Sequence, residues 1–259
     1  MDRNRKGNII SLPTLRKLTL TDLKASLALG IDDFRSALLI DLCLVTPFVI
    51  AGLIMALITY RTGQTFWLVL AVLGFPMVGT LAAVGFYEVS RLQLLEKRPE
   101  LAEIAGLVWA ARSGQVPWLA TIIVVIFLFW FFIGHMIFAL FLGLSPMIHV
   151  STSLDVFFTS QGAMMLVIGT TIGAVFSGLV FALSIHGMPM LLDSDVDFIS
   201  AMLRSMSAVL QSLPIYLAWG ALIAVLLLLS VVPFFLGLLL TMPILGHTSW
   251  HLFKRLAHD

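Results

Sequence analysis

Charged residues, cysteine and recognisable catalytic motifs are all scarce in this chain. Only 11% of its 259 residues are charged, against roughly 25% in soluble proteins. Its single cysteine, Cys43, excludes an intramolecular disulfide and a thiolate metal cluster. No phosphate loop, zinc-protease motif, nucleophile elbow, carboxylate dyad or Ser–His arrangement stands out in the sequence. We therefore expect no enzyme activity and no metal site, and the net charge of +1 argues against a nucleic-acid partner.

Long apolar stretches dominate the sequence instead. Sixty per cent of the residues are hydrophobic, and the mean hydropathy is +1.06. A helix needs about 20 apolar residues to cross a hydrocarbon core of about 30 Å. The sequence therefore predicts an all-α membrane protein with six spans, at Leu38–Thr59, Phe66–Tyr87, Trp118–Leu142, Ala163–Ile185, Leu213–Leu229 and Val232–Phe253. The last two spans share one apolar block, and Pro233 suits a tight turn between them. A single tilted helix with a re-entrant segment is the alternative there.

Basic residues lie on one side of the predicted membrane. Of the fifteen Lys and Arg residues, only Arg61 falls in a loop that follows an odd-numbered span. By the positive-inside rule, both termini and the two long even-numbered loops are cytoplasmic. An odd number of spans would place the basic C-terminus outside, so the charge pattern favours an even count. The basic N-terminal stretch lacks the short apolar core of a signal peptide and suits anionic lipid of the inner leaflet.

The sequence is consistent with one membrane domain, residues 1–259, built from three related units. The units cover about residues 15–91, 99–190 and 194–256. Each contains an amphipathic helix followed by a hairpin of two spans. The segments Thr19–Asp22 and Ser194–Asp197 resemble capping boxes, which begin helices. Helices of this kind lie in the headgroup plane with their apolar face toward the lipid, so we predict three interfacial helices on the cytoplasmic side.

A Pro-x-x-Gly pattern recurs in spans two and six. It comprises Pro76 and Gly79 in the first case and Pro243 and Gly246 in the second. Proline kinks a helix, and broken helices at related positions of two repeats can form a transporter's binding site. The alternative is a packing kink at which the glycines admit a neighbouring helix. Pro47 in span one adds another kink and weakens the case for a special pair.

Small residues also form one face of span four. Gly169 and Gly173 are four residues apart and are continued by Ser177 and Gly178. Small residues allow helices in a membrane to approach closely. We expect this face to pack inside the protein, and self-association is the alternative.

Three segments resemble a known family. They are Gly74–Arg91, Pro243–His251 and Met188–Asp193, the last of which precedes an acidic helix start. They resemble a large bacterial family of predicted integral membrane proteins of unknown function, whose members are often named automatically as cytochrome c oxidase subunit I. The resemblance implies an integral membrane protein, and it implies no site residues because the family has none established.

The histidines do not support the oxidase name. An oxidase catalytic subunit needs a full set of intramembrane histidine ligands for haem and copper. Here His149 lies in an outer loop, and His251 and His258 lie at the cytoplasmic end, which leaves only His135, His186 and His247. We therefore exclude that subunit and expect no cofactor. A b-type haem between His135 and His186 is the alternative, although their different depths disfavour it. A neutral His135 bonded to a neighbouring helix accounts for that residue equally well.

Asp41 is the ionisable group of greatest interest. It lies one turn inside span one, where burying a charge costs about 3 kcal/mol or more. Glu88 and Arg91 lie at similar depth at the end of span two. One interpretation is an ion pair of Asp41 with Arg91 or Arg35 that fixes the first hairpin. The other is a proton or cation site, which the shallow depth of Asp41 disfavours.

These patterns favour a non-enzymatic accessory, assembly or scaffold component of a bacterial inner-membrane complex, and the oxidase name suggests a respiratory one. The lipid bilayer and a membrane-protein complex are the expected partners. A small-solute or proton-coupled transporter is the alternative, and lipid binding by the interfacial helices is a third hypothesis.

Overall fold

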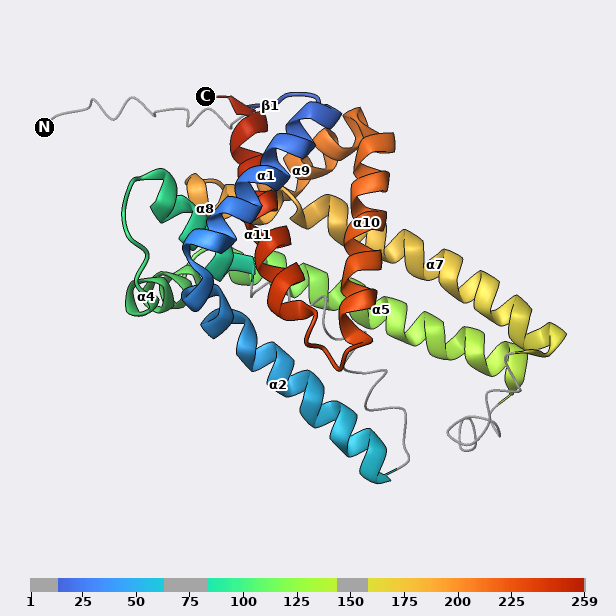
Figure 1. Cartoon of the computed structure of the whole chain (residues 1–259). Coiled ribbons are helices and arrows are strands. Elements are labelled where there is room, and N and C mark those ends of the chain that lie inside the picture. Colours follow the sequence, from blue (N-terminus) through green and yellow to red (C-terminus); the bar gives the residue numbers. More distant parts are fainter. Residues whose placement is uncertain (1–13, 63–82, 144–157, 259) are drawn as a thin grey trace, which may run out of the picture.

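The computed structural model of the chain describes residues 14–62, 83–143 and 158–258. These residues fold almost entirely into helices (Figure 1). The helices are α1 (Leu20–Ser36), α2 (Leu38–Thr62), an unlabelled helix over residues 83–94, α4 (Leu101–Ala111), α5 (Val116–Leu142), α7 (Ser160–Ser184), α8 (Gly187–Asp193), α9 (Phe198–Gln211), α10 (Leu213–Val231) and α11 (Leu238–Leu256). Two-residue strands β1 (Thr14–Leu15) and β2 (Ala257–His258) pair antiparallel. The predicted all-α class is confirmed, with this short pairing added.

Four helices are long and apolar enough to cross a membrane. They are α2, α5, the continuous segment Ser160–Asp193 that contains α7 and α8, and α10. Between 11% and 17% of the most apolar window of each is buried inside the molecule. The apolar side chains that remain exposed suit lipid or another protein. These helices coincide with four of the six predicted spans.

The other two predicted spans differ from the four. Most of Phe66–Tyr87 lies outside the described residues, and only its end appears, in helix 83–94. The other span, predicted at Val232–Phe253, does not begin as a helix. The chain turns after α10, with positive φ angles at Phe234 and Phe235. Helix α11 therefore begins at Leu238 rather than at Val232.

Helix α11 forms the centre of the core. Thirteen of its nineteen residues are buried, so it is enclosed by protein rather than by lipid. It packs mainly against α1, and also against α2 and α10. Two glycines permit the close contacts. A Cβ atom on Gly30 would lie 2.5 Å from Thr248 Oγ1, and one on Gly246 would lie 2.8 Å from Phe86 Cβ.

The three amphipathic segments are helical, as α1, α4 and α9. The predicted start of α1 is confirmed, because Thr19 and Asp22 form a reciprocal capping box. The predicted start of α9 at Ser194 is wrong. Its cap is Asp197, whose side chain accepts a hydrogen bond from the backbone N–H of Ser200, and Ser194 instead ends α8.

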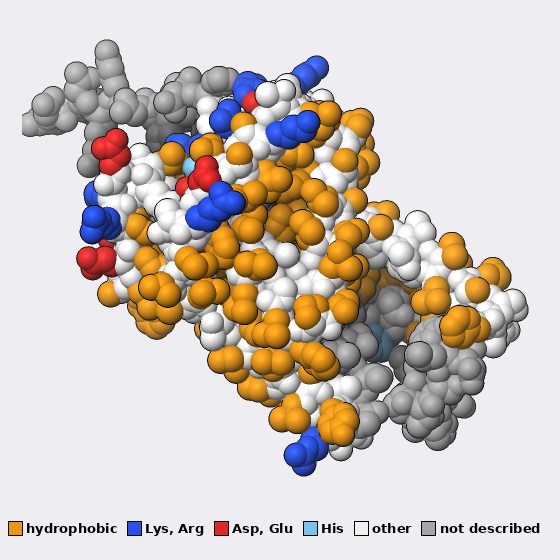
Figure 2. Space-filling model, viewed as in Figure 1, with side chains coloured by type: hydrophobic (Ala, Val, Ile, Leu, Met, Phe, Trp, Pro, Cys, Tyr) orange, Lys and Arg blue, Asp and Glu red, His pale blue; other side chains and the backbone are white. Residues whose placement is uncertain are grey.

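Charged and apolar side chains occupy different parts of the surface. Figure 2 shows most of the visible Lys, Arg, Asp and Glu side chains at the end that carries α1 and the described N-terminal residues. Orange apolar side chains cover most of the remaining visible surface. Figure 1 shows that α2 and the α5–α7 pair run away from the charged end in different directions. This division is typical of a membrane protein with one polar end.

Candidate functional site

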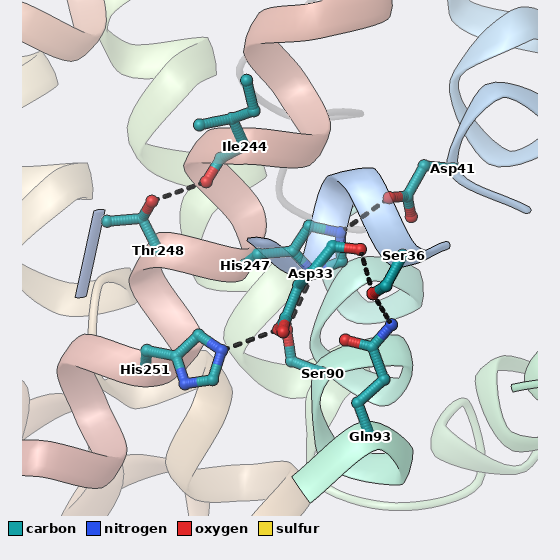
Figure 3. Close-up of polar contacts among 9 residues, drawn as sticks. All are labelled: Asp33, Ser36, Asp41, Ser90, Gln93, Ile244, His247, Thr248 and His251. Carbon is teal, nitrogen blue, oxygen red and sulfur yellow. Dashed lines mark hydrogen bonds and ion pairs between the residues drawn. The ribbon is translucent and has the colours of Figure 1, made fainter. Parts of the chain in front are cut away.

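Five polar side chains from four helices meet beside α11 and form a continuous series of hydrogen bonds (Figure 3). We call this series the polar chain. In order of contact, its members are Asp41 of α2, His247 of α11, Ser90 of helix 83–94, Asp33 of α1 and His251 of α11.

The distances in the polar chain are those of strong hydrogen bonds. His247 Nε2 lies 2.9 Å from Asp41 Oδ2, and His247 Nδ1 lies 2.8 Å from Ser90 Oγ. Ser90 Oγ lies 2.6 Å from Asp33 Oδ2. The same oxygen of Asp33 lies 2.7 Å from His251 Nε2. Both imidazole rings are therefore bonded to carboxylates, and Ser90 connects the two Asp–His pairs.

Helix geometry and two glycines bring these groups together. His247 and His251 are four residues apart, so they lie on one face of α11. Gly30 lets α1 approach that helix, which places Asp33 within reach of His251. Gly246 admits Phe86, which places Ser90, one turn later, beside His247. The Gly246 contact agrees with the packing interpretation of the Pro-x-x-Gly pattern.

Burial increases along the polar chain toward Asp41. The side chain of Asp33 is 14% exposed and that of His251 is 5% exposed, whereas those of His247 and Asp41 are both 0% exposed. Asp41 Oδ1 is also buried, and it has no hydrogen-bond partner among the described residues. A buried carboxylate oxygen without a donor is costly, so this end of the chain is an incompletely satisfied polar site.

The counter-ion expected for Asp41 differs from the one observed. The expected partners were Arg91 and Arg35. Arg91 Nε instead lies 2.7 Å from Glu88 Oε2, and Arg35 lies 3.5 Å from Asp32. Asp41 is bonded to His247, which is charged only when protonated.

Further polar contacts lie beside the polar chain and at the start of α1. Gln93 Nε2 donates to Ser36 Oγ, and Ser36 Oγ donates to the backbone carbonyl of Asp33. Near the start of α1, Arg16 holds Asp22 through two hydrogen bonds of 2.6 and 2.7 Å. The Arg16 guanidinium keeps the pKa of the Asp22 carboxyl well below its ordinary value.

The other two candidate histidines lie in separate environments. His186 is fully buried, and its Nε2 lies 2.6 Å from the hydroxyl oxygen of Tyr216. His135 instead donates from Nδ1 to the carbonyl of Phe131, one turn back in its own helix, at 2.8 Å. The two rings therefore have no hydrogen-bond partner in common within the described part of the chain. Among the described residues, no group of three or more His, Cys, Asp or Glu side chains could hold a metal ion.

Of the two Pro-x-x-Gly segments, the structure describes only the one in α11. Pro76 and Gly79 lie outside the described residues. Pro243 lies inside α11 and is buried.

Sequence reasoning missed Asp33, Ser90 and His251. It also missed the Ser–His contact, because Ser90 and His247 are 157 residues apart. The i,i+4 spacing of two histidines on one helix was the available signal. The order Ser90–His247–Asp41 is that of a hydrolase triad, but Ser90 is 0% exposed and its hydroxyl also contacts Asp33. A substrate cannot reach this hydroxyl in the structure.

Comparison with known proteins adds one family. The family model described as "Predicted integral membrane protein (DUF2189)" matches residues 68–193. Residues 68–193 are similar to this membrane-protein family. The expected resemblance to a family of predicted integral membrane proteins is thereby confirmed for residues 68–193, which include Gly74–Arg91 and Met188–Asp193, whereas Pro243–His251 lies outside the match. No curated protein and no solved structure matches the chain. Of the polar chain, only Ser90 lies in the matched range, so the family match does not account for the other four members.

Proposed function

We propose that this protein is a non-enzymatic accessory, assembly or scaffold component of a larger inner-membrane complex. The supporting observation is the α5–α7 pair, which extends away from the core (Figure 1). Only 11% of the most apolar window of each of its two candidate spans is buried inside the chain. Such helices need an outside surface to pack against, and a partner helix would supply one.

Glycines on this pair favour a protein partner over lipid alone. A Cβ atom on Gly134, Gly169 or Gly178 would meet nothing within 4 Å among the described residues. Glycine weakens a helix by about 1 kcal/mol relative to alanine, and in membranes it is used where another helix approaches closely. The small-residue face of α7 was expected to pack internally. Only Gly173 does so, with Trp130 Nε1 3.2 Å from the position of its Cβ.

The topology proposed with this role has both ends on one side of the membrane. Pairing of β1 with β2 holds residues 14–15 beside residues 257–258, which requires an even number of crossings between them. Ser90 contacts Asp33 after α2, and Leu256 contacts Arg16 after α10. The chain thus returns to the region of α1 after α2 and again after α10, and these two returns support an arrangement of six crossings in three hairpins. The charged end shown in Figure 2 would then face the cytoplasm, with α1, α4 and α9 at the interface.

Affinity purification from gently solubilised native membranes tests the accessory role. We expect a stoichiometric membrane complex to co-purify, and mass spectrometry would identify it. Gly169→Leu should release that partner, because it fills the open small-residue position. Val175→Leu, at an exposed and already large position of the same helix, is the matched control and should retain it. Recovery of the wild-type chain alone would contradict the proposal.

A second candidate function is proton-coupled transport, and the buried polar chain favours it. Intramembrane ionisable groups commonly mark ion or proton pathways. Flux should then appear in proteoliposomes that contain the purified chain alone, and it should fall in Asp41→Asn, Pro76→Ala and Pro243→Ala. Flux that none of the three substitutions alters would count strongly against this function.

A further inference from the structure

The charge balance of the polar chain depends on bound protons. It contains two carboxyl groups and two imidazoles, and no Lys or Arg of the described residues lies in ion-pair contact with either carboxyl group. The charged groups on neighbouring elements are paired with one another instead: Glu88 with Arg91, Asp193 with Lys254, Asp32 with Arg35 and Asp22 with Arg16. Buried carboxylates need a counter-charge, and within the described part of the chain protons on the imidazoles or on the carboxyl groups themselves supply it.

We propose that the polar chain is a proton relay, in which a proton passes between Asp33 at the more exposed end and Asp41 at the buried end. The four hydrogen bonds provide the path. Each contact is 2.9 Å or shorter, so no atom has to move far for a proton to cross it.

The first state of the relay has the proton on Asp41. Asp33 is then ionised and accepts hydrogen bonds from Ser90 Oγ and from His251 Nε2. His247 is neutral, with its hydrogen on Nδ1, and it donates to Ser90 Oγ. The carboxyl group of Asp41 donates to His247 Nε2. All four hydrogen bonds are formed, with one donor hydrogen in each.

The second state has the proton on Asp33. The carboxyl group of Asp33 donates to Ser90 Oγ, and the hydroxyl of Ser90 donates to His247 Nδ1. His247 Nε2–H donates to Asp41, which is now ionised. His251 Nε2–H still points at Asp33 Oδ2. The same heavy atoms remain paired, so both states fit the one observed arrangement.

The step between the two states is balanced in atoms and charge. Going from the second state to the first, Asp33 gives its proton to Ser90 Oγ, and Ser90 gives its own hydrogen to His247 Nδ1. His247 releases its Nε2 hydrogen to Asp41 Oδ2. Ser90 and His247 each gain one proton and lose one, so the net result is one proton moved from Asp33 to Asp41. An imidazolium at His247 between two ionised aspartates has the same proton count and is the intermediate.

The two ends of the relay differ in their access to water. Asp33 retains some exposure, so it can exchange protons with solvent. Asp41 is closed off, and its free Oδ1 leaves one acceptor position to which a later donor or cation would bind. This inference does not depend on the accessory role, because every group in the relay belongs to this one chain.

The exchange rate of the Asp41 proton tests the relay. The full-length protein in lipid nanodiscs is transferred from H₂O to D₂O, and the carboxylic-acid C=O stretch is followed by infrared spectroscopy. The band that disappears in Asp41→Asn belongs to Asp41. Ser90→Ala removes the connecting hydroxyl, and we expect exchange at Asp41 to slow by about tenfold or more, equivalent to a barrier higher by about 1.4 kcal/mol.

Two further variants make the result decisive. Asp33→Asn keeps the shape of the side chain but cannot pass a proton on, so it should also slow exchange at Asp41. This variant replaces Ser90→Ala in the test if Ser90→Ala does not fold. Ser26→Ala is the matched control, because Ser26 is equally buried but its Oγ has no hydrogen-bond partner in the described structure. In this variant the Asp41 proton should exchange at the wild-type rate. A merely loosened fold would speed up exchange, so slowing is specific to the relay. Wild-type rates in both Ser90→Ala and Asp33→Asn, or no Asp41 carboxylic-acid band at any pH, would overturn the proposal.

Discussion

The α1–α11 core and the α5–α7 pair are both helical and rich in apolar residues, but they are packed in opposite ways. In the core, neighbouring side chains occupy the space beside Gly30 and Gly246. The polar groups there are buried and hydrogen-bonded. On α5–α7, a Cβ atom on Gly134 or Gly169 would meet none of the described residues within 4 Å. Among the residues that the structure describes, the helices around α11 are therefore closely packed, and part of the α7 surface is not covered. We infer that the core carries internal chemistry, whereas the α5–α7 pair is a surface for binding.

The largest expected effect is at His247. His247→Ala leaves the Asp41 carboxyl group buried without its partner, and it should lower the free energy of unfolding by about 3–5 kcal/mol. His135→Ala on α5 removes a ring that is bonded only to its own helix, so it should cost much less. Denaturant unfolding in mild detergent, monitored by circular dichroism, measures both. Equal losses would contradict the distinction between the two regions.

Glycine substitutions compare the two regions directly. Gly30→Ala places a Cβ atom 2.8 Å from the backbone nitrogen of Thr248, and overpacking of this kind costs about 1–3 kcal/mol. In Gly169→Ala the added methyl group meets none of the described residues within 4 Å, so the higher helix propensity of alanine should leave stability unchanged or raise it by up to about 1 kcal/mol. Thermal unfolding of the purified variants would show the opposite signs. A loss at Gly169 similar to that at Gly30 would mean that the α7 face is already packed within the chain.

The hydroxyl of Ser90 should contribute less than the ring of His247. Ser90→Ala leaves Asp33 and His247 without a shared partner and should cost about 1–3 kcal/mol. Ser26→Ala should be nearly neutral, because that buried hydroxyl makes no bond within the described residues. Chemical unfolding of both variants separates the loss of a hydrogen bond from the loss of a buried atom.

The smallest predicted effect is at the start of α1, through pH. The pKa of Asp22 is lowered in the folded protein from an ordinary value of 3.8. Its ion pair with Arg16 therefore stabilises the fold above that pH, and this contribution is lost as the pH falls below it. Because Arg16 is partly exposed, the contribution should not exceed about 1 kcal/mol. The difference in unfolding midpoint between wild type and Asp22→Asn should begin to shrink below pH 3.8 and should close only as the pH falls through the much lower pKa that Asp22 has in the folded protein. A constant difference at all pH values would contradict this ion pair.

Local patterns predicted most of the helices but not their surroundings. Four spans follow from runs of apolar residues, because hydropathy is a property of neighbouring residues. The start of α1 follows from Thr19 and Asp22 in the same way. The last predicted span, Val232–Phe253, combined a turn with a helix whose end is polar. The four polar residues His247, Thr248, Ser249 and His251 were a sequence signal, not used in that prediction, for a helix enclosed by protein rather than by lipid.

The polar chain could not be predicted, because its contacts are distant in sequence. Asp41 and His247 are 206 residues apart, and Asp33 and His251 are 218 apart. The sequence alone places Asp33 and Arg35 alike on the polar faces of an amphipathic helix. Only the packing of α1 on α11 shows that Asp33 points inward while Arg35 stays exposed. An arginine partner for Asp41 was reasonable from depth along the spans, and the three-dimensional arrangement of α2 and α11 replaced it with a histidine.

Photo-cross-linking in native membranes tests the contrast between the two regions most directly. One photoreactive residue replaces Leu166, which is exposed and lies three residues before Gly169 on the same face of α7, and another replaces Leu252, which is buried in α11. We predict that position 166 cross-links to one defined membrane protein that also co-purifies with the chain, and that position 252 gives only intrachain products. Cross-linking of position 166 to lipid alone, or of position 252 to another protein, would contradict the account.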